Sequence, residues 1–114
     1  MKDLSVVIVN WNTREVTKNC LQSLFEQTKD IDFEVWVVDN GSADGSVEML
    51  KKEFPQVKLI KNSDNLGFAK ANNQALRQAQ SKFILLLNSD TIILNNTLAK
   101  MVAFMEKNST VGIS

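Results

Sequence analysis

Residues 83–91 read FILLLNSDT, and this stretch decides the predicted fold. Its first five residues, 83–87, form an uninterrupted apolar run of strand length, which is typical of a strand buried on both faces of a parallel sheet. The polarity changes at once in residues 88–91, where Asp90 stands among small polar side chains. Such a segment is either a simple turn or part of a ligand site, because open α/β sheets bind ligands beyond the carboxyl ends of their strands.

The rest of the chain alternates between strand-like and helix-like patterns. Strands are predicted at residues 4–9, 33–38, 57–60 and 83–87. Apolar residues at helical spacing follow each of them, at residues 16–25, 47–54, 68–79 and 98–105. This order predicts an α/β fold of the Rossmann-like, three-layer α/β/α kind, with a mostly parallel sheet and right-handed crossovers.

Local signals predict where the helices begin and end and which faces they bury. Asn12, followed three residues later by a glutamate, predicts a capping box at the start of the first helix, and Pro55 ends the second. Helical spacing assigns Val16, Val47 and Phe68 to the buried faces of the first three helices. The face of the third helix is otherwise rich in alanine, so we expect that helix to lie close to the sheet.

Composition indicates an ordinary globular domain. The chain has 114 residues, of which 44% are hydrophobic and 23% are charged, and we expect one domain over residues 1–114. Lys plus Arg and Asp plus Glu number 13 each, so the overall charge gives no reason to expect a nucleic-acid partner. A cytoplasmic location is predicted by three features: a single cysteine, Cys20, no apolar run near the roughly 20 residues of a membrane span, and no convincing signal peptide.

Two absences from the sequence narrow the chemistry. There is no histidine, which excludes a Ser-His-Asp or Cys-His nucleophile and a histidine-ligated zinc site. The four glycines have no spacing that matches G-x-G-x-x-G or the P-loop. A dinucleotide dehydrogenase and a P-loop nucleotidase are therefore disfavoured.

Amide and carboxylate side chains follow all four predicted strands. They are Asn10 and Asn12, then Asp39 and Asn40, then those of residues 62–65, and finally those of residues 88–91. Because the carboxyl ends of parallel strands share one edge, we expect these groups to surround a polar cleft. Their oxygens suit Mg²⁺ or Mn²⁺, which bring phosphates with them, and amides also bind nucleobases and sugar hydroxyls. The sequence therefore predicts a site for a metal-bridged nucleoside diphosphate.

Four segments carry a resemblance to a known family. They are VVIVNWN (6–12), VVDNGSADGS (37–46), NLGFAKANN (65–73) and LLLNSDT (85–91). Their order and spacing resemble the nucleotide-binding half of family 2 glycosyltransferases with the GT-A fold, over nearly the whole chain. The segment LNSDT resembles the variant in which Asn replaces the first aspartate of the family's Asp-x-Asp metal motif, frequent among rhamnosyltransferase-like enzymes of bacterial surface polysaccharides.

The resemblance implies a function and its partners. The full-length enzyme would transfer a sugar from a UDP- or dTDP-linked donor to a saccharide or lipid-linked acceptor, with Mg²⁺ or Mn²⁺ as cofactor. It would act in the cytoplasm or at the cytoplasmic face of the membrane. Asp39 would hydrogen-bond the nucleobase, Asn10 and Asn12 would lie against the base and ribose, and Asp90 would hold the metal with support from Asn88.

Further nucleotide contacts are implied for Asn40, Asn65, Gly67 and Asn73. The pair formed by Asn72 and Asn73 stands where many relatives have Arg-Asn, so an arginine that contacts the diphosphate is not present at this position. Lys70 is the candidate to replace it. The resemblance assigns no catalytic residue, because the general base of an inverting relative lies well downstream of the metal motif.

The last residues suggest that the sequence is cut from a longer protein. Residues 111–114 read as the beginning of a further strand, so the predicted fold is truncated and the acceptor-binding part is absent. We therefore expect this chain to be inactive alone and to self-associate through an exposed sheet edge. Two alternatives stay open: a nucleotidyltransferase that forms sugar nucleotides, and a non-catalytic flavodoxin-like α/β binding module.

Overall fold

A computed structural model of the chain describes residues 2–107 and shows a single sheet between helices. The strands are β1 (Lys2–Asn10), β2 (Phe33–Asp39), β3 (Lys58–Lys61) and β4 (Ser81–Leu87). The helices are α1 (Arg14–Gln27), α2 (Ser46–Glu53), α3 (Phe68–Leu76) and α4 (Thr97–Lys107). Each strand is followed by one helix, as the sequence pattern predicts.

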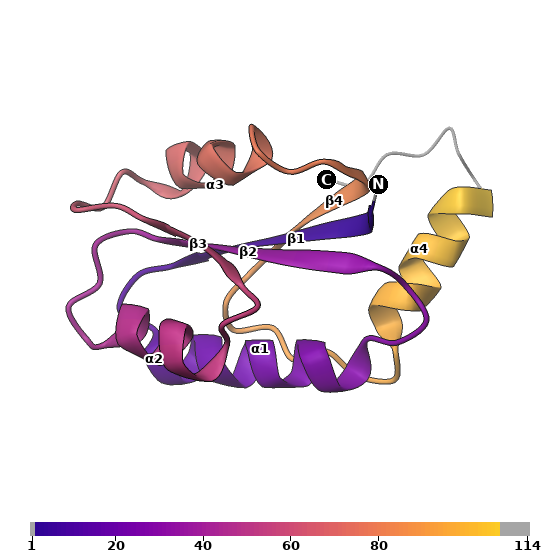
Figure 1. Ribbon diagram of the computed structural model, residues 1–114, viewed down its shortest axis with the longest axis horizontal. Coiled ribbons are helices and arrows are strands. Elements are labelled where there is room, and N and C mark those ends of the chain that lie inside the picture. Colours follow the sequence, from indigo (N-terminus) through magenta and orange to yellow (C-terminus); the bar gives the residue numbers. More distant parts are fainter. Residues whose placement is uncertain (1, 108–114) are drawn as a thin grey trace.

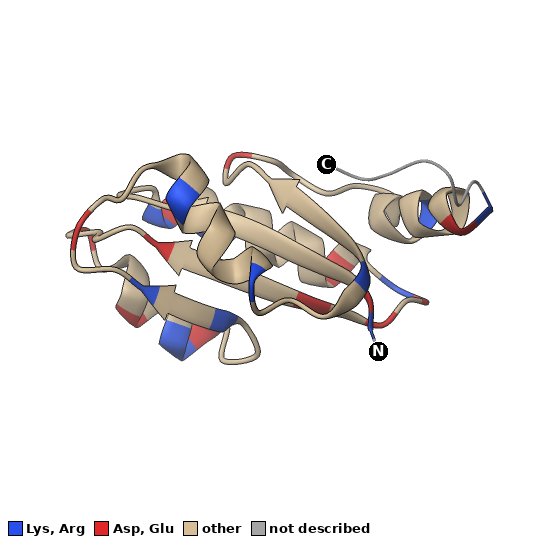
Figure 2. Cartoon of the chain, turned by 90° about the horizontal axis from the view of Figure 1, so that it is seen from above, with Lys and Arg blue, Asp and Glu red and all other residues tan. Residues whose placement is uncertain are grey.

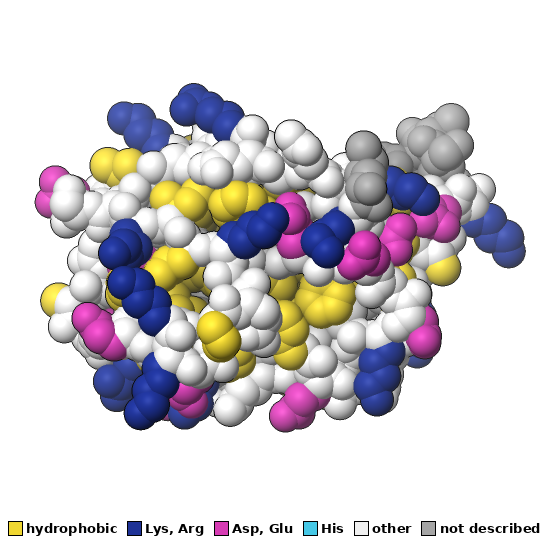
Figure 3. Space-filling view, viewed as in Figure 1, with side chains coloured by type: hydrophobic (Ala, Val, Ile, Leu, Met, Phe, Trp, Pro, Cys, Tyr) yellow, Lys and Arg dark blue, Asp and Glu magenta, His cyan; other side chains and the backbone are white. Residues whose placement is uncertain are grey.

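The four strands are parallel and lie in the order β3-β2-β1-β4. Helix α3 covers one face of this sheet, and α1 and α2 cover the other (Figure 1). The prediction of a Rossmann-like α/β/α arrangement with a parallel sheet is therefore confirmed. Lys and Arg are interspersed with Asp and Glu over the views in Figures 2 and 3, in keeping with the balanced charge of the sequence.

Alternate residues of the central strands bury their side chains on opposite faces. On the face of α1 and α2, Val6 and Ile8 of β1 pack into the larger core together with Leu21 of α1 and Leu50 of α2. On the other face, Val7, Trp36 and Val38 pack against Ala71 and Ala75, both fully buried. The alanine face of α3 therefore lies directly on the sheet, as predicted, and it adds almost no side-chain bulk between the layers.

The segment between β4 and α4 runs back along α1 to the amino end of the sheet (Figure 1). Three contacts follow its course: Cys20 with the carbonyl of Asn88, the Ser23 hydroxyl with the N–H of Ile93 at 2.9 Å, and the N–H of Lys29 with the Asn96 side chain at 2.8 Å. Leu98 and Val102 of α4 then join the larger core.

Several predictions about helix ends and faces are wrong. The first helix begins after Thr13 rather than Asn12, with no capping hydrogen bond from a side chain, because the side chain of Asn12 instead accepts a bond from the N–H of Ala43 at 2.8 Å. Val16 and Phe68 are 40% and 57% exposed. Both occupy the first turn of a helix, and the buried residues of these two helices begin at Thr17 and Ala71.

The buried face of α2 also differs from the prediction. Met49 and Leu50 are buried, whereas Val47 is only half-buried and lies outside both cores. The end of α2 agrees better with the sequence. The helix stops at Glu53, and Phe54 forms its C-cap immediately before Pro55.

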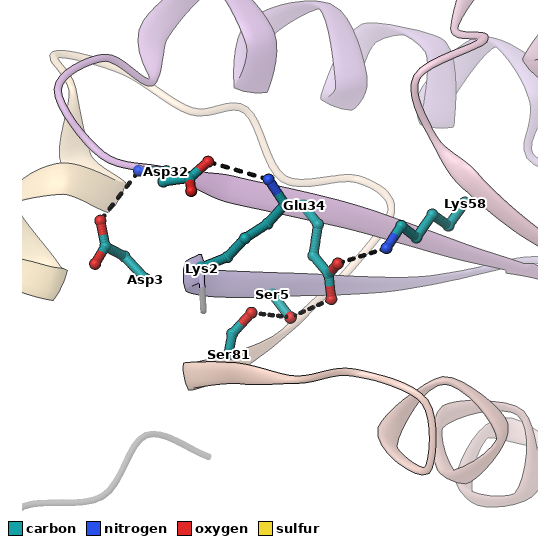
Figure 4. Close-up of polar contacts among 7 residues, drawn as sticks. All are labelled: Lys2, Asp3, Ser5, Asp32, Glu34, Lys58 and Ser81. Atoms are coloured by element: carbon teal, nitrogen blue, oxygen red, sulfur yellow. Dashed lines mark hydrogen bonds and ion pairs between the residues drawn. The ribbon is translucent and has the colours of Figure 1, made fainter.

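A buried carboxylate lies near the amino end of the sheet (Figure 4). The Glu34 side chain is 8% exposed and accepts hydrogen bonds from Lys58 at 2.8 Å, Ser5 at 2.6 Å and Trp36 at 2.8 Å. Because the Ser5 proton goes to Glu34, Ser81 donates the 2.6 Å bond that joins the two serine hydroxyls. The cluster links β1, β2, β3 and β4 at the end opposite to the predicted cleft.

Candidate functional site at the carboxyl edge of the sheet

The ends of β1 and β2 meet in a buried amide–carboxylate pair. Strand register places Asn10 opposite Asp39, and the Asn10 Nδ2 group donates to Asp39 Oδ1 over 2.7 Å. The two residues are 0% and 1% exposed, respectively. Polar side chains this deeply buried are stable only when hydrogen-bonded. The pair therefore fixes the positions of the two loops that follow these strands.

Three hydroxyl groups complete this pair. Asn10 Oδ1 accepts bonds from Thr13 at 2.8 Å and from Thr17 at 2.7 Å, both of which belong to the first part of α1 or its N-cap. Asp39 accepts the Ser42 hydroxyl at 2.7 Å and the Ser42 N–H at 3.0 Å. The Asn10 amide is thereby held in one orientation, with its oxygen toward α1 and its NH₂ group toward the loop after β2.

The hydrogen bonds limit how Asp39 can contact a ligand. An ionised carboxylate offers about four acceptor positions, and three donors from Asn10 and Ser42 already use this group. About one acceptor position therefore remains. The contact with a nucleobase that the sequence assigns to Asp39 would have to use that position, from a side chain that is almost completely buried.

Asn40 holds the next loop in place. The N–H of Asn62 donates to the carbonyl of Asp39 at 2.8 Å, and the Asn62 side chain donates to Asn40 Oδ1 at 3.0 Å. Asn40 Nδ2 lies 3.2 Å from Asn65 Oδ1 and 3.3 Å from the carbonyl of Gly67. Asn40 is 2% exposed, so it acts as the buried centre of a group of amides that joins β2 to residues 62–67.

Glycines allow this loop to approach its neighbours. Gly41 has a φ of +84°, and a Cβ atom there would lie 3.0 Å from the carbonyl oxygen of Ser63. Gly67 has a φ of +87° and forms the N-cap of α3. Both positions are in the left-handed region, where glycine has no steric penalty. Gly67 contributes its carbonyl oxygen to the bond from Asn40, and its contact with a nucleotide stays a prediction.

A hollow of about 250 Å³ opens at this edge of the sheet. It is lined by Val9, Trp11, Thr13, Asn40, Asn65, Phe68 and Ser89. These residues come from the ends of β1, β2 and β4, from the loop after β3 and from α3. The rings of Trp11 and Phe68 are 51% and 57% exposed, so they present aromatic surface beside a polar floor. The predicted convergence of the strand ends therefore produces a concave surface.

Not all predicted site residues lie together. Asn40 and Asn65 line the hollow, and Asn10 and Asp39 lie outside its lining in the buried hydrogen-bond network. Asn12 is exposed and bonds Ser42 and Ala43. Asn88 and Asp90 are exposed on either side of Ser89. Asn73 is exposed on α3 outside the residues that line the hollow, whereas Asn72 is buried at 4% exposure.

Asp90 is the candidate metal ligand. Within residues 2–107, no three His, Cys, Asp or Glu side chains are grouped closely enough to hold a metal ion. Mg²⁺ in nucleotide sites is usually bound by one or two carboxylates together with substrate phosphates and water. The exposed carboxylate of Asp90, next to the hollow, fits a cation that is shared with a diphosphate rather than held by the protein alone.

Two other polar groups near the edge have structural roles. Asp44 accepts the N–H of Arg14 at 3.0 Å and that of Ser46 at 3.1 Å, so it connects the first residues of α1 and α2. Burial opposes ionisation of Asp44, but hydrogen bonds from Ser46 and Arg14 outweigh it and lower the pKa. Burial, together with the charge of Asp90, raises the pKa of the Cys20 thiol to about 11, as expected for a core residue rather than a nucleophile.

Sequence reasoning missed several residues of the site. Thr17 is buried at a helix position where the spacing predicts an apolar side chain, and Ser42 lies in a loop whose serines look like ordinary turn formers. Gln74 reaches Asn62 from α3, which no local pattern indicates. The one available signal was the spacing of Thr13 and Thr17, four residues apart and hence on the same face of a helix.

A family model identifies the protein family of this chain. The family model described as glycosyl transferase family 2 matches residues 5–114. The chain belongs to glycosyl transferase family 2. This membership confirms the resemblance seen in the sequence, and it favours a glycosyltransferase over the nucleotidyltransferase and flavodoxin-like alternatives.

Three similar proteins, two of them with crystal or complex structures, support the same conclusion. The glycosyltransferase YfnE of Bacillus subtilis is 36% identical over 96% of this chain and 28% of YfnE. The crystal structure of Staphylococcus aureus TarS in complex with UDP has a TM-score of 0.84 and 31% identity, over 94% of this chain and 33% of the TarS chain. The mannosyltransferase of Pyrobaculum calidifontis, in complex with GDP-Man and Mn²⁺, has a TM-score of 0.77 and 26% identity, over 92% of this chain and 34% of that chain.

The matched region is a small part of these family 2 proteins. The chain spans between 18% and 39% of the length of three curated relatives. The similarity to TarS and to the mannosyltransferase therefore concerns the sheet and the loops described above. It confirms the GT-A fold of this part of the family.

Proposed function

We propose that the carboxyl edge of the sheet binds a nucleoside diphosphate sugar, with UDP or dTDP as the nucleotide, as the donor for glycosyl transfer. The observation that carries this proposal is the hollow between the ends of β1, β2 and β4, which combines exposed aromatic rings with fixed amides. The structures of TarS with UDP and with UDP-GlcNAc support it, because TarS shares the fold at 31% identity.

The nucleoside would occupy the hollow. Trp11 and Phe68 supply flat apolar surface on which a base can lie, and such stacking is typically worth about 1–3 kcal/mol per base. Asn65 supplies a polar group there, and Asn40, whose amide is fully hydrogen-bonded within the protein, holds Asn65 in place. Asp39 would accept a base N–H through its remaining acceptor position, and the Asn10 network would keep that carboxylate oriented.

The diphosphate would lie toward the end of β4. Asp90 would hold Mg²⁺ or Mn²⁺ there, with Asn88 as a neighbouring oxygen ligand or ribose contact. When bound, the cation would neutralise the charge that develops on the departing diphosphate. Lys70, exposed on α3, is the candidate cation of the protein itself, although it lies outside the residues that line the hollow.

In the complete enzyme, the donor site would act with an acceptor site. We propose a saccharide or lipid-linked acceptor, as in the synthesis of polysaccharides or glycoconjugates in the cytoplasm or at the cytoplasmic face of a membrane. Within residues 2–107, no helix is both long and apolar enough to cross a membrane. Activation of the acceptor hydroxyl requires a positioned base, typically worth about 10²–10⁴-fold in rate. We assign Asp39 and Asp90 to the donor side, and we expect this chain alone to bind the donor without transferring the sugar.

Titration with UDP tests the proposal. We expect weak binding that strengthens when Mg²⁺ or Mn²⁺ is added and weakens again with EDTA. ADP provides a matched control with the same diphosphate and a larger base. No binding of UDP or dTDP in the presence of either cation would reject the proposed function.

A further inference from the structure

The orientation of the Asn40 amide is determined by the backbone around it. Its oxygen accepts the N–H of Leu66 at 3.3 Å, and its nitrogen donates to the carbonyl of Gly67 at 3.3 Å. Backbone groups cannot exchange donor and acceptor, so a flipped Asn40 would place like groups against each other. The amide therefore has one orientation that satisfies both neighbours, and this orientation constrains the side chains next to it.

The constraint extends through Asn62 to Gln74. Because Asn40 offers its oxygen, Asn62 must donate its NH₂ group, and the two atoms lie 3.0 Å apart. The same NH₂ group donates to Gln74 Oε1 at 2.8 Å, and Gln74 Nε2 donates back to Asn62 Oδ1 at 2.9 Å. Gln74 thus anchors the Asn62 amide from α3, in the orientation that Asn40 sets. We call Gln74, Asn62, Asn40 and Asn65 the amide relay.

The last member of the amide relay lies in the hollow. Asn65 Oδ1 accepts bonds from Asn40 Nδ2 at 3.2 Å and from the N–H of Gly67 at 2.8 Å, which uses both of its lone pairs. The Asn65 NH₂ group has no hydrogen-bond partner in the described part of the chain. Asn65 is exposed and lines the hollow. Its side chain therefore has an oxygen committed to the protein and a donor that remains for a ligand.

We propose that the amide relay presents the Asn65 NH₂ group as a fixed hydrogen-bond donor to an acceptor oxygen of the nucleotide, and that Gln74 is a positioning residue for this contact. The inference rests on the proposed function. The family resemblance already implies a nucleotide contact for Asn65, and the new elements are the fixed orientation of its amide and the role of Gln74. An acceptor oxygen is available on the carbonyl groups of a pyrimidine base and on the diphosphate. The rings of Trp11 and Phe68 beside Asn65 favour the base carbonyl.

Asn65→Asp is a sharp test because it changes one group. The aspartate keeps the oxygen that accepts bonds from Asn40 and Gly67. It replaces the NH₂ donor with a second oxygen and adds one negative charge. We expect the melting temperature to stay nearly unchanged while the affinity for UDP falls about tenfold or more, since a donor is lost and an acceptor faces an acceptor. Titration with uridine, which carries no phosphate, separates loss of the donor from charge repulsion. Weaker binding of uridine to Asn65→Asp supports a base carbonyl as the acceptor, and unchanged binding of uridine rejects it.

Gln74→Met tests the relay at a distance from the ligand. Methionine has a similar length but cannot bond Asn62, and Gln78→Met, at an exposed glutamine just after α3, is the matched control. We expect a loss of about threefold to tenfold in UDP affinity for Gln74→Met and none for Gln78→Met. If Gln74 acts through Asn65, Gln74→Met should lower the UDP affinity of the Asn65→Asp variant little further. The side-chain NH₂ resonances of Asn65 should also shift in the ligand-free Gln74→Met protein.

The possible results separate this inference from the proposed function. Failure of the wild-type chain to bind UDP would overturn both. Normal binding of UDP by Asn65→Asp would overturn only the donor assignment. Equal, additive losses from Gln74→Met in the two backgrounds would overturn the positioning role of Gln74, because a merely structural effect is indifferent to the group at residue 65.

Discussion

Asn10 Nδ2 lies 2.7 Å from Asp39 Oδ1, although 29 residues separate the two in the chain. Parallel register places them side by side where β1 and β2 end, and burial makes their contact difficult to replace. The loop after β1 and the loop after β2 are therefore held together by this pair. A ligand that touches either loop meets a surface whose position is set by this pair.

Asp39→Ala should weaken UDP binding about tenfold to a hundredfold without changing the requirement for a divalent cation. The lost interaction is a hydrogen bond to a charged acceptor, worth about 1.5–3 kcal/mol. The free energy of unfolding should fall as well, because the change leaves the buried Asn10 amide without its acceptor. Calorimetric titration with and without EDTA measures the first effect, and chemical denaturation measures the second. An unchanged affinity would leave Asp39 with a structural role alone.

Asp90→Ala should abolish the cation-dependent part of UDP binding and leave thermal stability nearly unchanged. The side chain is exposed, so its removal disturbs no core packing. Glu26→Ala, which removes an exposed carboxylate from α1, is the control for a general change in charge. If UDP bound equally well to Asp90→Ala with Mg²⁺ and with EDTA, the metal role would stand. A variant that still responded to Mg²⁺ like the wild type would show that the cation is held elsewhere.

The Glu34 cluster should contribute stability that depends on pH. Burial opposes ionisation, but bonds from Lys58, Ser5 and Trp36 outweigh it and lower the pKa of Glu34 from 4.5 to about 2. A carboxylate with a lowered pKa in the folded state stabilises the protein above its ordinary pKa and loses that effect as the pH falls. The difference in unfolding free energy between wild type and Glu34→Gln should therefore be constant above about pH 5 and shrink from pH 4.5 toward pH 2. A difference that did not vary over this range would contradict the shift.

The two edges of the described sheet differ, and we expect self-association through β4. Strand β3 is short and has exposed lysines at Lys58 and Lys61, which discourage pairing with another chain. Strand β4 spans seven residues and is almost entirely apolar from Phe83 onward. Light scattering should show a mass that rises with protein concentration. Ile84→Lys on β4 should reduce this association and Ile60→Lys on β3 should not, whereas a strict monomer at high concentration would exclude it.

The sequence predicted the arrangement of the fold better than the details of the site. Uninterrupted apolar runs such as residues 4–9 identified buried parallel strands, and the order of elements then left few possible topologies. Positions at the first turns of helices were predicted least well. Helical spacing places Val16 and Phe68 on the same side as the buried residues of their helices, but it carries no information about which turns of that side are covered.

The hydrogen bonds of the site depend on contacts between distant residues. Local patterns correctly indicated which side chains follow each strand, and therefore which ones gather at the carboxyl edge. They could not indicate that Asn10 and Asp39 face each other in the interior, or that Gln74 on α3 reaches Asn62. Asn12 shows the limit most clearly, because its side chain has a local capping role by sequence and a long-range contact with Ala43 in the structure.

Mapping of backbone amide shifts on addition of UDP and Mg²⁺ tests the central claim most directly. A chain of 114 residues is well suited to this measurement, and weak binding is no obstacle to it. We predict that the largest changes occur at Trp11, Asn40, Asn65 and Ser89, around the hollow at the carboxyl edge of the sheet. Changes confined to the opposite end, for example at Asp30 and Lys100 beside α4, or no changes at saturating UDP, would contradict the account.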